Sequence, residues 1–161
     1  MHFTGFMLAR SVGFEFNHVP YQGSASAVPD LLGGQIAASI APIDVPLPHI
    51  QSGKIRALAT TGPQRSPFLP DVPTIKEVGY PSLEFVDWMG VFLPAKTPAE
   101  TVGNLDSAIR QVLKKEEIKA AFTKISYEIA SASGGDFARL IKSDFERWGP
   151  IVKASGYKPE D

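Results

Sequence analysis

The sequence predicts an α/β fold, in which short helices alternate with the strands of a parallel sheet and a helical segment follows. Over residues 2–60, helical and strand-like segments alternate three times. This order is typical of parallel strands joined by right-handed crossovers. Charge is distributed unevenly, because the first 60 residues carry only Arg10, Glu15, Asp30, Asp44, Lys54 and Arg56, whereas residues 97–161 are rich in Lys and Glu. A charge-poor region suits a covered sheet, and a charge-rich one suits helices exposed on one face.

The first region contains three helices and three strands by pattern. Phe3, Phe6 and Met7 fall at helical spacing and predict a helix over residues 2–12, which ends at Gly13. The following segments are expected, in order, as a strand at 15–19, a helix at 24–32 capped by Ser24 and ended by Gly33-Gly34, a strand at 35–41, a short helix at 45–51 capped by Asp44, and a strand at 54–60.

The second region begins after a proline-rich surface excursion at 62–73. Thr74 and Glu77 have capping-box spacing and predict a brief helix that ends near Gly79. The later segments are expected as a strand at 84–93, a helix from the Thr97-Pro98-Ala99-Glu100 capping box to about 114, a helix at 117–124, a strand at 127–130 and a helix at 136–153. The last helix has an apolar face made of Phe137, Leu140, Ile141, Phe145, Trp148, Ile151 and Val152.

Composition excludes several classes of function. The 161 residues are 43% hydrophobic, which is enough for one sizeable core. The net charge of −1 offers no basic excess for nucleic acid or an anionic membrane. Without cysteine there are no disulfides, thiolate metal sites or cysteine nucleophiles. The N-terminal residues lack the basic region and the apolar run of a signal peptide, and no window has the length of a transmembrane helix.

Catalytic and metal motifs are weak. His2, His18 and His49 have no compact ligand spacing, so packing or surface roles are favoured over metal binding, and no cofactor is expected. No GxSxG elbow is present. A triad of Ser24, His18 or His49, and Asp44 stays open as an alternative, although nothing local supports it.

A ligand site is indicated where two expected strands end. Tyr21-Gln22-Gly23-Ser24 leads from the first strand into a helix, the position of the ligand crevice in open α/β sheets. Backbone N–H groups at a helix start suit a carboxylate. Asp44 ends the next strand and could accept a hydrogen bond from a ligand hydroxyl, amine or bridging water, or could serve as an N-cap. Trp88 and Phe92 could line a cleft or pack in the core.

These residues resemble the substrate-binding receptors of tripartite tricarboxylate transporters, often called Bug-type receptors. The resemblance lies in an ordered series of segments: His18-Val19-Pro20-Tyr21-Gln22-Gly23-Ser24-Ala25, Asp30-Leu31-Leu32-Gly33-Gly34-Gln35, Gly53-Lys54-Ile55-Arg56-Ala57-Leu58-Ala59, Arg65-Ser66-Pro67, Leu69-Pro70-Asp71-Val72-Pro73-Thr74, Trp88 through Leu93-Pro94-Ala95, Thr97-Pro98 and Trp148-Gly149.

The resemblance implies a periplasmic-binding-protein-like fold of type II, with two α/β lobes around a cleft. It places residues 1–85 in the second lobe, and 86–161 as the return strand and C-terminal helices of the first lobe. It implies capture of a small organic carboxylate without chemistry, delivery to membrane transporter subunits and a periplasmic location. The second-lobe ligand contacts map to His2, Tyr21, Gly23, Ile43 and Asp44, to which Ser24 is added by its place at the helix start.

The chain is shorter than the family that it resembles. The export signal, the glycine-rich loop of the first lobe and most of the loop before His2 are not in this sequence. A fragment, or a short protein that forms a homodimer through the apolar face of its last helix, would account for this. The alternatives in function are a small hydrolase or other enzyme on a half-receptor scaffold, and a non-binding dimeric remnant.

Overall fold

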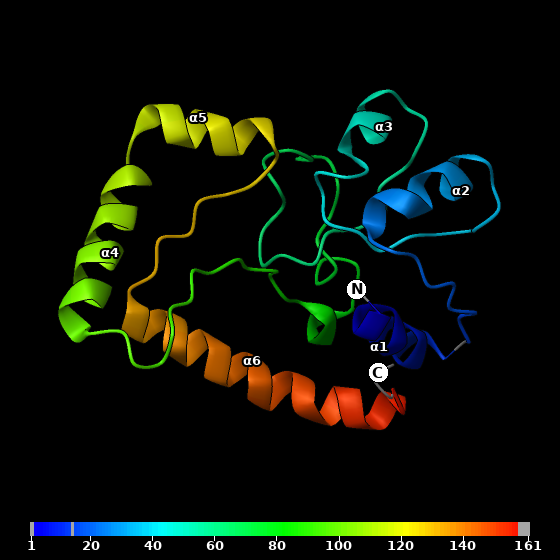
Figure 1. The fold of residues 1–161 in the computed structure, drawn as a ribbon. Coiled ribbons are helices and arrows are strands. Elements are labelled where there is room, and N and C mark those ends of the chain that lie inside the picture. Colours follow the sequence, from blue (N-terminus) through cyan, green and yellow to red (C-terminus); the bar gives the residue numbers. More distant parts are fainter. Residues whose placement is uncertain (1, 14, 158–161) are drawn as a thin grey trace. The chain divides into compact units, whose positions relative to one another are not determined.

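The computed structural model describes residues 2–13 and 15–157, and in this part the regular elements are helices (Figure 1). The elements are α1 (His2–Val12), the 3₁₀-helix η1 (Ser24–Ala27), α2 (Val28–Leu32), α3 (Leu47–Gln51), the 3₁₀-helix η2 (Pro81–Leu83), α4 (Ala99–Val112), α5 (Glu116–Lys124) and α6 (Gly134–Ser155). Among the described residues, none of these helices combines the length and the apolar character needed to cross a membrane.

The helices expected in the first region are confirmed with small shifts. The helix α1 has the expected bounds and ends at Gly13, whose φ of 75° is the left-handed conformation that glycine adopts without strain. The helix expected over 24–32 is divided into η1 and α2. Capping by Ser24 was wrong, because Gly23 occupies the N-cap position of η1.

Capping of α3 by Asp44 was also wrong. The N-cap position is Pro46, and no side chain caps the helix. Residues 43–46 form turns in which the backbone supplies the acceptors: Leu47 N donates to Ile43 O at 3.1 Å, and His49 N donates to Pro46 O at 3.0 Å. Because these turns already lead the chain into the helix, the carboxylate of Asp44 is left for other contacts.

The two capping boxes behave differently. Glu77 N donates to Thr74 Oγ1 at 3.2 Å and Thr74 N donates to Glu77 Oε2 at 2.7 Å, so this box forms, although turns and no regular helix follow it. The box expected at Thr97 does not form, since the Thr97 hydroxyl donates to Pro94 O at 2.8 Å and α4 begins two residues later with Pro98 as N-cap.

The helices α4, α5 and α6 confirm the helical C-terminal region. The longest, α6, extends two residues beyond the expected range at each end. It begins where Ser133 Oγ accepts a hydrogen bond from Asp136 N at 3.1 Å, and it ends before Gly156, whose φ is 68°.

The five segments expected as strands are not assigned as strands among the described residues. One isolated parallel bridge joins Thr60 and Thr74, through Thr60 N to Pro73 O at 2.9 Å and Ile75 N to Thr60 O at 2.6 Å. Phe85 N donates to Thr61 O at 2.8 Å on the same segment. A strand exists only with a hydrogen-bonded neighbour. The expected segments lack such ladders here, so the parallel sheet stays a prediction.

The chain divides into two compact units, Met1–Asp87 with Ile151–Asp161, and Trp88–Pro150. The first unit contains the described side chains that are most buried, namely Thr4, Ala27, Leu47, Leu69, Thr74 and Leu83. Leu83 is 2% exposed and lies in η2, which contacts α1. The expected division into lobes at residue 85 concerns a two-lobed receptor and remains a prediction.

The second unit is organised around Phe137 of α6. The ring of Trp88 meets the Phe137 ring edge-on at 4.9 Å, and Phe92 lies at 5.5 Å from it. The backbone of Gly90 lies directly beneath the ring, because a Cβ added there would be 2.1 Å from Phe137 Cζ. Trp88 Nε1 also donates to Asp144 Oδ2 at 2.6 Å. Of the two expected cleft or core residues, Trp88 is therefore half-buried in packing, while Phe92 is 66% exposed.

Candidate functional site

Tyr21 lies at the end of segment 15–21, which has no regular structure, and its hydroxyl is held by α2. Tyr21 Oη donates a hydrogen bond of 2.7 Å to Asp30 Oδ2 in a half-buried position. This hydrogen bond is the main reason why the pKa of Tyr21 is raised above its usual value of 10.0. The phenol is therefore protonated throughout the neutral range, and its proton points at Asp30.

Gly23 makes the turn that connects this tyrosine to η1. Its φ of 92° is favoured only for glycine. The Gly23 N–H donates to Tyr21 O at 2.9 Å, and Gly23 O accepts from Ser26 Oγ at 2.7 Å. The tight turn therefore uses the Gly23 N–H internally, and this group is not free for a ligand. Ser24 follows as the first residue of η1.

Ile43 and Asp44 lie in the turns before α3. Ile43 O accepts the hydrogen bond from Leu47 N, which fixes the backbone of this turn. Asp44 Oδ1 is buried and has no hydrogen-bond partner within the part of the chain that the structure describes. A buried acceptor without a partner is unfavourable by about 1–3 kcal/mol. Asp44 thus has an acceptor position that no described residue uses.

His2 makes no hydrogen bond to these residues within the described chain, and its ring packs against other aromatic rings. Its ring centroid is 4.4 Å from that of His18, 5.3 Å from Phe3 and 5.7 Å from Tyr157. Partial burial, and then the neighbouring His18, lower the pKa of His2 below 6.5. Both causes favour the neutral imidazole.

The structure therefore connects some of the expected site residues and not others. Tyr21 and Gly23 share a backbone hydrogen bond, and Gly23 directly precedes Ser24. In residues 2–13 and 15–157, no hydrogen bond joins Ser24 to His18 or His49, as a triad would need. Within the same residues, no group of three potential metal ligands gathers.

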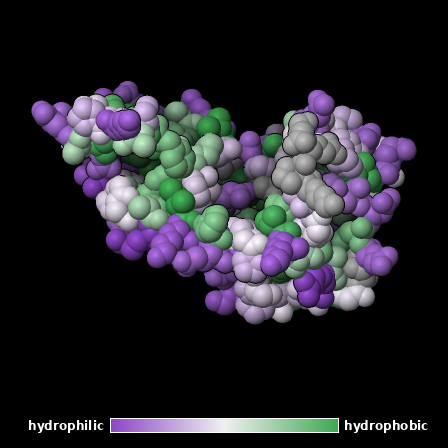
Figure 2. All heavy atoms as spheres, turned by 60° about the horizontal axis from the view of Figure 1, so that its bottom comes forward, coloured by the Kyte–Doolittle hydropathy of each residue, from purple (hydrophilic) through white to green (hydrophobic). Residues whose placement is uncertain are grey.

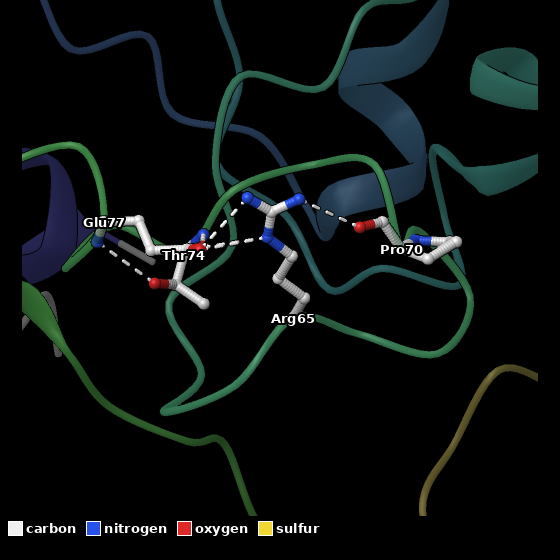
Figure 3. Close-up of polar contacts among 4 residues, drawn as sticks. All are labelled: Arg65, Pro70, Thr74 and Glu77. Atoms are coloured by element: carbon white, nitrogen blue, oxygen red, sulfur yellow. Dashed lines mark hydrogen bonds and ion pairs between the residues drawn. The ribbon is translucent and has the colours of Figure 1, made fainter.

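Sequence patterns missed one polar cluster, shown in Figure 3. Arg65 Nε lies 3.1 Å from each oxygen of Glu77, and Arg65 Nη1 donates to Pro70 O at 3.3 Å. Glu77 in turn accepts from Thr74 N (Figure 3). The network ties both ends of the proline-rich loop together. Opposite charges on either side of that loop were the available signal.

Comparison with known proteins identifies the family. The model of the tripartite tricarboxylate transporter family receptor matches residues 1–157. The chain belongs to this family. BugT of Bordetella pertussis is 35% identical over 146 residues, which are 91% of this chain and 45% of BugT. A protein from the tcbD–tcbE intergenic region of Pseudomonas sp. (strain P51) is 34% identical over 153 residues, covering 94% of this chain and 46% of that protein.

The chain spans about half the length of these two relatives. A third, from the clcB–clcD intergenic region of Pseudomonas knackmussii, is 33% identical over 156 residues, and there the match covers 90% of the relative and 94% of this chain. Relatives of about the same length as this chain and relatives of about twice its length therefore both occur.

Solved structures give the same fold. Rpa4515 of R. palustris, solved with adipate, has a TM-score of 0.85 and 31% identity, and the match covers 99% of this chain and 53% of that one. MatC of Rhodopseudomonas palustris, solved with malate, has a TM-score of 0.81 and 26% identity over 94% of this chain and 52% of that one. The periplasmic binding protein BugD has a TM-score of 0.83 and 29% identity, and the match covers 99% of this chain and 54% of BugD. The fold of this chain is therefore similar to that of about half of a periplasmic binding protein of this family.

Proposed function

We propose that this chain is a solute-binding receptor, or the part of one, that captures a small organic carboxylate for a tripartite tricarboxylate-type transporter in the periplasm. The observation that carries the proposal is the family match over residues 1–157. It is supported by two structural relatives that hold dicarboxylates, adipate and malate. Relatives of this chain are receptors, so we propose binding and release without chemistry.

The proposed site is the segment Tyr21–Ser24 together with Ile43, Asp44 and His2. All of these residues belong to the first unit. Support comes from two features: the glycine turn that fixes the start of η1, and the acceptor of Asp44 that has no partner in the described chain. The resemblance implies two lobes around a cleft, and closure of such lobes on a ligand goes only as far as the ligand's differential contacts drive it.

A thermal-shift screen against mono-, di- and tricarboxylates and aromatic acids at millimolar concentration tests this function. A ligand that binds only the folded chain raises the melting midpoint by mass action. We expect a shift with at least one dicarboxylate and none with a matched uncharged diol. A cooperative melt that no acid shifts would contradict the proposal.

We also propose that the chain forms a homodimer through exposed apolar side chains of its C-terminal helices, together with those of the segment that packs on them. Phe145 of α6 is 79% exposed. In the segment before α4, Met89, Val91 and Phe92 are 66–72% exposed. Figure 2 shows hydrophobic side chains (green) at the surface among hydrophilic ones. Such exposure favours association. Light scattering during gel filtration should give twice the chain mass of 17.4 kDa, and Phe145→Glu should reduce it. A monomer at every micromolar concentration would contradict this proposal.

A further inference from the structure

The hydroxyl of Tyr21 has one proton, and that proton is already used. A phenolic oxygen offers one donor and two lone pairs. Tyr21 Oη donates its proton to Asp30 Oδ2 at 2.7 Å. An ionised carboxylate only accepts, so the direction of this hydrogen bond is not ambiguous. Toward any other group, Tyr21 can act only as an acceptor.

Asp30 is well placed to keep this direction. It lies in the first turn of α2, where a negative charge is favoured, and its backbone carbonyl accepts from Gln35 N at 2.8 Å. The acid is therefore fixed at both its backbone and its side chain. It lies nine positions after Tyr21, which follows a segment without regular structure. The hydrogen bond is consequently the contact that sets the orientation of the tyrosine hydroxyl.

We infer that Asp30 is a positioning residue that makes the Tyr21 hydroxyl an acceptor, so that the site selects a carboxylate carrying a hydroxyl or amine donor. This inference rests on the proposed function of the same site. A hydroxyl that can only accept disfavours a plain carboxylate oxygen and favours an O–H or N–H group of the ligand.

The structural relatives include ligands of both kinds. Malate carries a hydroxyl beside its carboxylates, whereas adipate has none. The inference places this chain with the hydroxylated class. Succinate is the matched control ligand, because it is malate without the hydroxyl.

The test compares the dissociation constants of L-malate and succinate by calorimetry. Wild-type protein should bind L-malate more tightly than succinate. Tyr21→Phe should raise the dissociation constant of L-malate by about fivefold to tenfold and leave that of succinate nearly unchanged. Asp30→Ala frees the tyrosine proton to donate to a carboxylate oxygen, so the preference for L-malate should disappear or reverse. Asp71→Ala removes an exposed acid outside the site and should keep the wild-type preference.

Each outcome decides the inference. If Asp30→Ala weakens the binding of L-malate and of succinate equally and lowers the melting temperature, Asp30 has a purely structural role and the inference is wrong. If Asp30→Ala fails to fold, the ratio of the two constants in Tyr21→Phe decides alone, and an unchanged ratio overturns the inference. Binding of other acids without any preference for L-malate contradicts the inference but leaves the proposed function standing. Absence of binding by every acid removes both.

Discussion

The guanidinium of Arg65 lies against the carboxylate of Glu77, with Nε 3.1 Å from each oxygen and Nη2 3.0 Å from Oε1. The hydrogen bond from Arg65, and then that from Thr74 N, lower the pKa of Glu77 from 4.5 to about 2. The pair connects the two sides of the loop between residues 65 and 77. Both side chains are close to half exposed, so salt weakens their attraction.

Stability should therefore depend on the charge of Glu77 in acid. A group whose folded pKa is depressed contributes stability above its unfolded pKa, and this contribution is lost as the pH falls toward the folded value. We expect Glu77→Gln to be less stable than wild type above pH 4.5, and the difference to vanish by about pH 2. Urea unfolding at a series of pH values measures it. Glu15→Gln, whose carboxylate has no ion pair or hydrogen bond in the described chain, should follow wild type throughout.

Close approach of the Gly90 backbone to the Phe137 ring excludes a side chain at this position. An alanine Cβ would lie 2.1 Å from Cζ and 2.6 Å from Cε1 of Phe137. Gly90→Ala should lower the free energy of unfolding by about 1–3 kcal/mol, because the ring must shift. Phe137→Leu should recover part of this loss in the double variant.

Gly103 provides the matched control. It lies inside α4, and an added Cβ would meet nothing within 4 Å. Gly103→Ala should raise stability by about 0.5–1 kcal/mol through helix propensity. Equal effects of the two glycine substitutions in chemical denaturation would contradict the packing described for Phe137.

The indole of Trp88 is anchored by Asp144 as well as by its ring contact. Its Nε1 donates to Oδ2 at 2.6 Å across 56 residues of sequence. Trp88→Phe keeps a ring against Phe137 but loses the hydrogen bond, and should cost about 1–3 kcal/mol of unfolding free energy. In a double-mutant cycle, Asp144→Ala should add little to Trp88→Phe. Additive losses would show that the two side chains act independently, and Asp87→Ala should be close to neutral.

The pKa of His2 should lie below the ordinary histidine value. Burial, and then the charge of His18, lower the pKa of His2 below 6.5. Because the unfolded chain binds a proton more readily, this histidine favours folding above pH 6.5 and loses that contribution as the pH falls through 6.5 to its folded pKa. In NMR titrations, His18→Gln should raise the pKa of His2 only part of the way, since burial remains. His49→Gln should leave it unchanged, and a complete return to 6.5 in His18→Gln would contradict the order of the two causes.

Local patterns predicted the helices well. The 3.6-residue apolar period of residues 136–153 is strong enough to define α6 to within two residues, and the glycines at 13, 34 and 156 have the positive φ of helix ends. The strands could not be settled in the same way. A segment such as 35–41 is apolar and short, but strand pairing depends on neighbours distant in sequence. The Thr60–Thr74 bridge is the isolated pairing that the described residues make.

The candidate site was only partly accessible from sequence. The Tyr21–Ser24 segment and Asp44 stand out by their place at segment ends, yet their roles in capping were misjudged, because backbone turns at Gly23 and Pro46 do that work. The Tyr21–Asp30 hydrogen bond was missed. Its signal was an acid in the first turn of the helix that follows a tyrosine, a pattern that becomes specific only when the fold brings the two together.

Calorimetric titration of L-malate and adipate into the wild-type chain, and into a Tyr21→Ala, Asp44→Ala double variant, tests carboxylate binding most directly. The account predicts a saturable heat with one site per chain for L-malate, and its loss in the double variant without loss of the cooperative melt. No saturable heat from either acid, or a heat that the double variant retains in full, would contradict it.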